Sequence, residues 1–191
     1  MKQIILTQEQ INHKIRRIAY QIYETHADEQ EVILAGIAGN GYIFAEKLAA
    51  MLKEISSLEI KLCEVKIIPF QFRQLMHNLI SNALKFKHPE HDPKIVIKGE
   101  IGKGSAFHLD SLQQRKKYCH ITVTDNGIGF NSDYAEKIFE VFQRLHGKEE
   151  YEGTGIGLAI VKKIVENHQG YIEAHGEPEK GATFDIYLPA V

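Results

Sequence analysis

The sequence has little cysteine, little net charge and no long hydrophobic run. Cys63 and Cys119 are the only cysteines in 191 residues, so we expect neither a disulfide framework nor a metal knuckle. A formal net charge of -2 gives no electrostatic reason to expect nucleic acid or an anionic membrane as a partner. No apolar run approaches the roughly 20 residues that cross a bilayer, and the first ten residues become polar too early for a secretory signal. We therefore expect a cytoplasmic chain without membrane contact.

The first 60 residues alternate between helical and strand patterns. Isoleucines recur at helical spacing from Ile11 to Ile22, and VILAGI (32–37) is typical of a buried strand. A second apolar helix face follows the strand, and LEIKLCEVKI (58–67) alternates as a further strand should. This order predicts a partial α/β, Rossmann-like unit with parallel strands over residues 1–60.

A different pattern begins near Pro69 and continues to the end of the chain. A long helix is predicted over 70–86, paired strands over 94–101 and 120–127, a helix over 155–167, and two alternating strands after it. Segregated helices and antiparallel strands are typical of the α+β class. Residues 61–191 are therefore predicted to form an α/β sandwich, with helices on one face of a mixed, mainly antiparallel sheet.

Two asparagines and a lysine share one face of the predicted helix 70–86. Asn78 and Asn82 are four residues apart, and Lys85 lies almost one turn beyond Asn82. Two carboxamide oxygens beside an ammonium group suit a hard cation that already holds phosphates, such as Mg²⁺. An exposed, asparagine-rich helix face is an equally good interpretation of this segment alone.

Two glycine-containing turns follow. In VTDNGIGF (123–130) a strand ends at Asp125, and Gly127 and Gly129 permit a sharp turn; Asn-Gly alone more often marks a plain hairpin. An aspartate at that place can also accept a hydrogen bond from an exocyclic amine such as that of adenine. In YEGTGIGLAI (151–160) alternate glycines lead into a helix, whose first N–H groups can bind phosphate.

The order of these segments is more specific than any one of them. Four motifs, in this order, resemble the N, G1, G2 and G3 boxes of sensor histidine kinases. They are Asn-x-x-x-Asn-x-x-Lys-Phe, Asp-x-Gly-x-Gly, Gly-x-Gly-x-Gly and the Gly-x-Thr-Phe that ends at Phe184. The stretch from Ile138 to Gly170 is similar to the F box and ATP lid of that family. The resemblance covers about residues 60–191 and implies a Bergerat-type domain whose cofactors are ATP and Mg²⁺.

The resemblance also implies roles for individual residues. Asn82 would be the principal Mg²⁺ ligand with Asn78 assisting, and Lys85 would contact phosphate. Asp125 would bind the adenine amino group, with Thr183 nearby through a shared water. Phe139 and Phe142 would anchor the lid by packing. The full set of residues expected to bind ATP is Asn78, Asn82, Lys85, Phe86, Asp125, Gly127, Gly129, Arg144, Gly153, Thr154, Gly155, Gly157, Leu158 and Thr183.

Two features define what this domain is expected to do with ATP. Gyrase-type relatives of the family carry a water-activating glutamate where this chain has Asn78, which cannot act as a general base. None of the ten histidines lies in a His-Glu-x-x-x-Pro signature, so we expect no autophosphorylation of the usual kind. The expected partners are a histidine-bearing dimerisation domain or a response regulator.

The first 60 residues resemble the N-terminal part of type I phosphoribosyltransferases, notably those similar to pyrimidine-operon regulators. GIAGNGY (36–42) would match their pyrophosphate-contacting loop, but their later acidic loop for the ribose phosphate has no counterpart. We therefore expect no productive binding of phosphoribosyl pyrophosphate. The chain therefore joins part of one enzyme to a domain of another near residue 60, and a natural fusion, an artificial chimera or a sequence error would each explain this. Exposed sheet edges in this unit suggest a homodimer.

Overall fold

The computed structural model describes residues 7–143 and 154–191, which divide into two compact units, Met1–Val65 and Lys66–Val191. The first unit consists of α1 (Gln8–Thr25), β1 (Glu31–Ile37), α2 (Asn40–Ile55) and β2 (Glu59–Val65). Strands β1 and β2 pair in parallel, as the sequence predicted, with Glu31 opposite Glu59 and Ile37 opposite Val65. Strand β2 runs through the boundary expected at residue 60 and belongs wholly to this unit.

Local signals explain the two helices of the first unit. The hydroxyl of Thr7 accepts a hydrogen bond from the Gln10 amide, and the Gln10 side chain accepts one from the Thr7 amide, which forms a capping box at the start of α1. One apolar stripe of α1 packs on one apolar stripe of α2 through Ile15, Ala19, Leu48 and Leu52.

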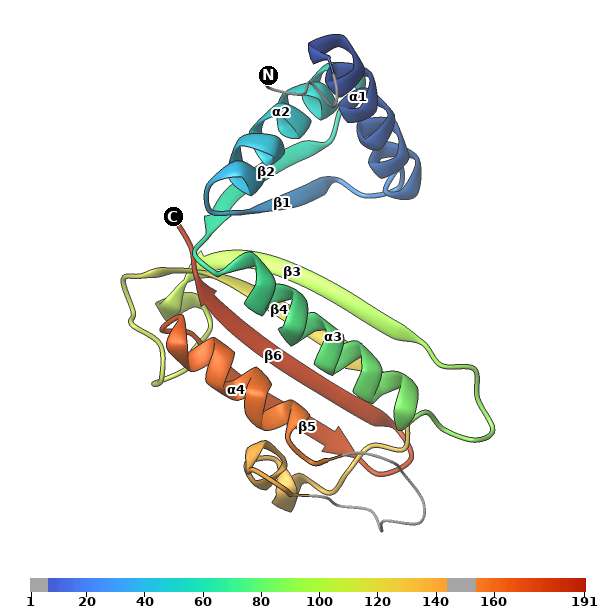
Figure 1. Cartoon of the computed structure of the whole chain (residues 1–191), viewed down its shortest axis with the longest axis vertical. Coiled ribbons are helices and arrows are strands. Elements are labelled where there is room, and N and C mark those ends of the chain that lie inside the picture. Colours follow the sequence, from blue (N-terminus) through green and yellow to red (C-terminus); the bar gives the residue numbers. More distant parts are fainter. Residues whose placement is uncertain (1–6, 144–153) are drawn as a thin grey trace, which may run out of the picture. The chain divides into compact units, whose positions relative to one another are not determined.

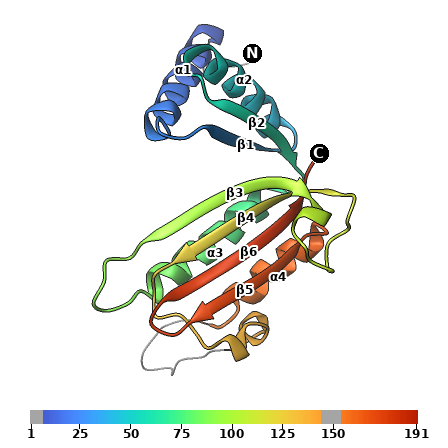
Figure 2. The same cartoon turned by 180° about the vertical axis from the view of Figure 1, so that it is seen from behind.

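The second unit contains two long helices and a four-stranded sheet. Its elements are α3 (Pro69–Lys85), β3 (Ile95–Lys103), β4 (Lys117–Asp125), α4 (Gly157–Asn167), β5 (Tyr171–Glu177) and β6 (Gly181–Pro189), with short 3-10 turns at Gly104–Ala106, Ser132–Tyr134 and Lys137–Phe139. The strand order is β3-β4-β6-β5, and every neighbouring pair is antiparallel. Both helices cover one face of this sheet and run antiparallel to each other (Figures 1 and 2). The predicted α+β class is confirmed.

The two faces of the sheet differ in character because side chains alternate along each strand. Phe184, Ile186 and Leu188 of β6 are buried beneath the helices, whereas Asp185 and Thr183 point to the other face. We call this second side the open face (Figure 2). One end of it is covered by Phe107, Leu109 and Leu112, which pack on aromatic residues of β4 and β6. No helix in the described part of the chain is long and apolar enough to cross a membrane.

Candidate functional site

Helix α3 directs Asn78 towards the first residue of α4. The Asn78 side-chain oxygen lies 3.5 Å from the point that a Cβ atom would occupy at Gly157. The Asn78 amide nitrogen is buried and has no hydrogen-bond partner within residues 7–143 and 154–191. A buried donor without a partner costs about 1–3 kcal/mol. Such a group at this position fits a site whose polar ligand supplies the missing acceptor.

The end of α3 is tied to the turn that follows Asp125. The Phe86 carbonyl accepts a hydrogen bond of 2.9 Å from the Ile128 amide. A Cβ atom at Gly127 would lie 2.3 Å from that same carbonyl oxygen, so only glycine fits there. The Lys85 ammonium lies 4.5 Å from the centre of the Phe86 ring, a cation–π contact. Phe86 and Lys85 are therefore held beside the turn that follows Asp125.

Asp125 ends β4 and is half-buried. Its Oδ1 atom accepts hydrogen bonds from the amides of Gly127, at 2.9 Å, and Ala182, at 3.3 Å. Burial raises the pKa of the Asp125 carboxyl, because the loss of hydration outweighs the two backbone hydrogen bonds, which act in the opposite direction. An aspartate that is desolvated in this way is well suited to accept a hydrogen bond from a ligand.

The structure corrects the expected position of Thr183. Thr183 lies opposite Thr124 in the pairing of β4 with β6, and their hydroxyl oxygens are 3.0 Å apart. Because Asp125 follows Thr124, its side chain projects from the opposite face of the sheet. Thr183 therefore belongs to the open face and does not lie beside Asp125. The Ala182 amide, which donates to Asp125, lies where a Thr183 contact was expected.

The remaining residues expected at the site, together with Phe139 and Phe142, lie in different environments. Gly129 and Gly155 have positive φ angles of 63° and 70°, and a Cβ at Gly129 would lie 2.0 Å from a backbone oxygen. Thr154 and Leu158 flank the start of α4, whereas Arg144 and Gly153 lie outside the described residues. Phe139 is buried and packs edge-on against Phe184. Phe142 is 75% exposed, so the expected packing of both phenylalanines is correct only for Phe139.

Sequence reasoning missed the residues that hold the site together. His88 is buried; its Nε2 atom lies 2.9 Å from the Glu179 carboxylate, and its Nδ1 atom accepts from the Glu90 amide. Asn126 accepts a hydrogen bond from the Lys94 amide and donates one to the carbonyl of residue 92. These contacts attach the loop between α3 and β3 to the turn after β4 and to the turn between β5 and β6. No local pattern in the sequence predicts these contacts, because the partners are far apart along the chain.

Comparison with known proteins finds matches for both units of the chain. Residues 68–191 match the family model for histidine kinase-, DNA gyrase B- and HSP90-like ATPases, and residues 3–75 match the model for a phosphoribosyl transferase domain. The phytochrome-like protein Cph1 of Synechocystis sp. is 36% identical over 165 residues, which are 86% of this chain and 19% of that protein. Cyanobacterial phytochrome A of Nostoc sp. is 42% identical over 119 residues, which are 62% of this chain and 14% of that protein.

This chain thus spans less than a fifth of the length of these two relatives. Among solved structures, full-length ShkA in complex with AMPPNP is 20% identical to this chain, with a TM-score of 0.51. The match covers 99% of this chain and 32% of that one. A likeness at this identity supports the fold alone. The motif order, the helices on one face of an antiparallel sheet and the family match lead to one conclusion: through residues 68–191, the chain belongs to the family of histidine kinase-, DNA gyrase B- and HSP90-like ATPases.

Proposed function

We propose that the second unit binds Mg-ATP as the catalytic domain of a sensor histidine kinase. In this proposal it holds the γ-phosphoryl group for transfer to a histidine on another domain. The observation that carries the proposal is the buried amide of Asn78, which faces the start of α4 and lacks a partner among the described residues. Family membership and the packing of three motifs around α3 support the same function.

The residues at the phosphate end fit a magnesium-bound triphosphate. Asn82 and Asn78 would offer carboxamide oxygens to the ion, and Lys85 would add a positive charge. The first N–H groups of α4 and the positive end of its dipole would bind phosphate oxygens. Magnesium, when bound, would neutralise charge on the transferred group. Arg144 remains a proposed lid contact to the γ-phosphate, and Gly153, Thr154, Gly155 and Leu158 remain proposed ATP-binding residues.

The residues at the other end fit adenine. Asp125 would accept a hydrogen bond from the adenine amino group, and Phe86 would border the ring. Gly127 lets the turn pack against the end of α3, which brings this carboxylate close to Phe86, and Gly129 lets the turn pack against the backbone between β5 and β6. The protein groups would then bind and orient the nucleotide, which is the main contribution that proteins make to phosphoryl transfer.

The proposed fate of the γ-phosphoryl group depends on Asn78. A carboxamide cannot take a proton from water, so we expect slow hydrolysis and a nucleotide that is kept for another nucleophile. That nucleophile would be the histidine of a dimerisation domain, which would pass the group to a response regulator.

Titration calorimetry with ATP and magnesium tests the proposal. We expect Asn82→Ala and Asp125→Ala to weaken binding by at least about tenfold, since each removes a polar contact worth roughly 1.5 kcal/mol or more. Asn12→Ala, at an exposed position of α1, is the matched control. Thermal melts of every variant show whether the fold is kept. Wild-type affinity in both site variants would overturn the proposed site.

The family match of residues 3–75 supports a second candidate, binding of phosphoribosyl pyrophosphate by the first unit. The loop GIAGNGY joins β1 to α2, and a Cβ at Gly36 would lie 2.6 Å from the Cα atom of Tyr42, so close packing already explains that glycine. A thermal-shift assay separates the candidates: we expect Mg-ATP to raise Tm and phosphoribosyl pyrophosphate to leave it unchanged. A shift with the second compound would show that phosphoribosyl pyrophosphate binds and would favour the second candidate.

We also propose that the first unit forms a homodimer, because its sheet has two strands among the described residues and each strand has an unpaired edge there. Sedimentation velocity over a range of concentrations tests this. A monomer at the highest concentration would contradict it.

A further inference from the structure

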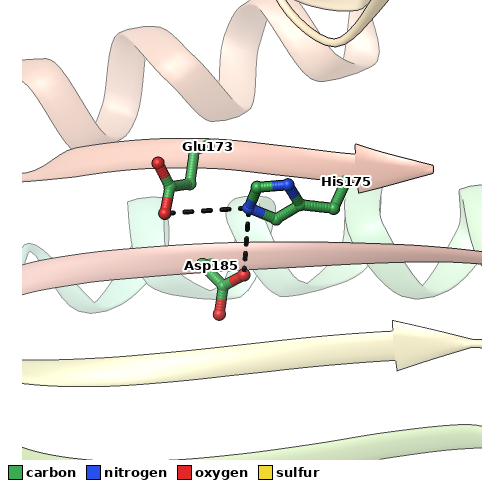
Figure 3. Close-up of side chains that lie close together, drawn as sticks. All are labelled: Glu173, His175 and Asp185. Carbon is green, nitrogen blue, oxygen red and sulfur yellow. Dashed lines mark ion pairs between the residues drawn. The ribbon is translucent and has the colours of Figure 1, made fainter. Parts of the chain in front are cut away.

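Three polar side chains converge on the open face of the sheet, away from the proposed nucleotide site. Glu173 and His175 are two residues apart on β5, so they project to the same side. Asp185 of β6 lies directly opposite Glu173 in the strand pairing. In Figure 3, dashed lines join one ring nitrogen of His175 to the carboxylates of Glu173 and Asp185. The cluster Glu173, His175 and Asp185 has no part in the proposed binding of ATP or of phosphoribosyl pyrophosphate.

The spacing of these groups suits a metal ion. The His175 Nε2 atom lies 3.8 Å from the Glu173 carboxylate and 3.9 Å from Oδ2 of Asp185, and one ligand atom from each residue lies within 4.8 Å of the others. A tetrahedral ion with bonds of about 2.0 Å holds its ligand atoms about 3.3 Å apart. The His175 side chain is 67% exposed, so a small rotation can shorten its distances to the two carboxylates, and the Glu173 side chain, which is 24% exposed, can move towards Asp185.

The charges of the cluster also favour a cation. Glu173 and Asp185 are like charges directly opposite on neighbouring strands, an arrangement that destabilises a sheet unless a positive charge lies between them. The Asp185 side chain is only 14% exposed, so water screens its charge incompletely, and His120 lies 2.7 Å from Oδ1 and compensates part of that charge. A divalent ion bound by both carboxylates would convert this repulsion into attraction.

Asp185 is held in position by residues behind it. Its Oδ1 atom lies 2.7 Å from Nε2 of His120 and accepts a hydrogen bond of 3.0 Å from the Thr122 hydroxyl. These contacts leave Oδ2 directed towards His175. Carboxylate ligands of metal sites are commonly oriented by such outer hydrogen bonds. His120 and Thr122 therefore act on this cluster as positioning residues.

We propose that Glu173, His175 and Asp185 bind a divalent transition-metal ion, of which zinc is the case to test. One imidazole and two carboxylates form a ligand set that suits zinc, whereas magnesium prefers oxygen ligands alone. Three protein ligands leave a fourth position for water or an external ligand. The site lies on the face of the sheet opposite Asp125, so zinc and Mg-ATP bind to separate places.

Zinc titration of the metal-free, untagged 191-residue protein tests the proposal. We expect calorimetry to give one zinc per chain at this cluster, and Co²⁺ in place of zinc to give a visible absorption band. His175→Ala should weaken zinc binding by at least about tenfold and abolish the band, because it removes one of three ligands. His13→Ala, at an exposed position of α1, should leave both unchanged. Absent zinc binding, or equal binding by wild type and His175→Ala, would overturn the proposal.

Two further variants separate ligand binding from a structural effect. Thr122→Val should weaken zinc binding by about tenfold because Asp185 loses an orienting hydrogen bond, and Thr122→Ser, which keeps the hydroxyl, should restore it. Asn82→Ala should lose ATP and keep zinc, so failure of one proposed site is distinguishable from failure of the other. Equal zinc affinity in Thr122→Val and wild type would contradict the positioning role.

Discussion

The side-chain oxygen of Asn78 lies 3.5 Å from the point where a Cβ atom would sit at Gly157, the first residue of α4. That distance is an ordinary van der Waals contact, so packing within the protein does not require glycine at this position. Gly127 is different, because its Cβ would overlap the Phe86 carbonyl oxygen at 2.3 Å. The two glycines therefore serve different purposes, and their substitution should have different consequences.

Gly157→Ala should fold normally and bind ATP about tenfold more weakly. Alanine is a better helix former than glycine by up to about 1 kcal/mol, so Tm should stay the same or rise. A methyl group at the start of α4 would hinder phosphate from reaching the first N–H groups, which is equivalent to the loss of one charge-assisted hydrogen bond. Thermal melts and ATP titration measure the two effects separately. Unchanged ATP affinity would contradict phosphate binding at α4.

Gly127→Ala is the matched control, with the opposite outcome. Its methyl group would overlap the backbone, and overpacking of this kind typically costs about 1–3 kcal/mol. We expect a clearly lower free energy of unfolding in urea, whatever happens to ATP binding. A variant as stable as wild type would show that the turn can move away from α3.

Asp125→Asn should abolish ATP binding without destabilising the protein at neutral pH. The pKa of Asp125 is raised in the folded protein by burial, so its contribution to stability is greatest below its unfolded pKa, near 4. That contribution is lost as pH rises through the higher folded pKa. Asparagine does not titrate, so Tm of the variant minus that of wild type should be larger at about pH 7 than at about pH 4.5. If this difference in Tm became smaller as the pH was raised from about 4.5 to about 7, the result would contradict a raised pKa of Asp125 in the folded protein.

The elements that the sequence predicted correctly have local signals. Helix α3 was predicted from apolar residues at helical spacing, and the same spacing placed Asn78 and Asn82 on one side of it. Strand β4 was predicted from alternation, and its end at Asp125 placed the carboxylate at the turn. Family resemblance then joined these segments into one site.

The parts that the sequence could not predict depend on register and on distant partners. A displacement of one residue moves a strand side chain to the other face, which is why Thr183 was wrongly placed beside Asp125. The contact between His88 and Glu179 joins residues 91 positions apart, and no periodicity of the chain encodes it. The open-face cluster was missed for the same reason, since Asp185 meets His175 only when β5 pairs with β6.

Thr183→Val should leave ATP affinity unchanged, within about twofold, because Thr183 projects from the open face. The Thr124 hydroxyl loses its partner, which should lower the free energy of unfolding by about 0.5–1.5 kcal/mol. Calorimetry with ATP and urea denaturation measure the two quantities. A tenfold loss of ATP affinity in a folded Thr183→Val would show that Thr183 faces the nucleotide after all.

Asn126→Ala should loosen the loop between α3 and β3. Asn126 accepts from the Lys94 amide at 2.7 Å and donates to the carbonyl of residue 92 at 3.0 Å, and loss of both bonds should cost about 1–2 kcal/mol. Asn126→Asp keeps the acceptor for the Lys94 amide but not the donor. Hydrogen exchange at the Lys94 amide should therefore accelerate in Asn126→Ala and stay slow in Asn126→Asp. Equal exchange at Lys94 in the two variants would show that the side chain of Asn126 does not protect this amide.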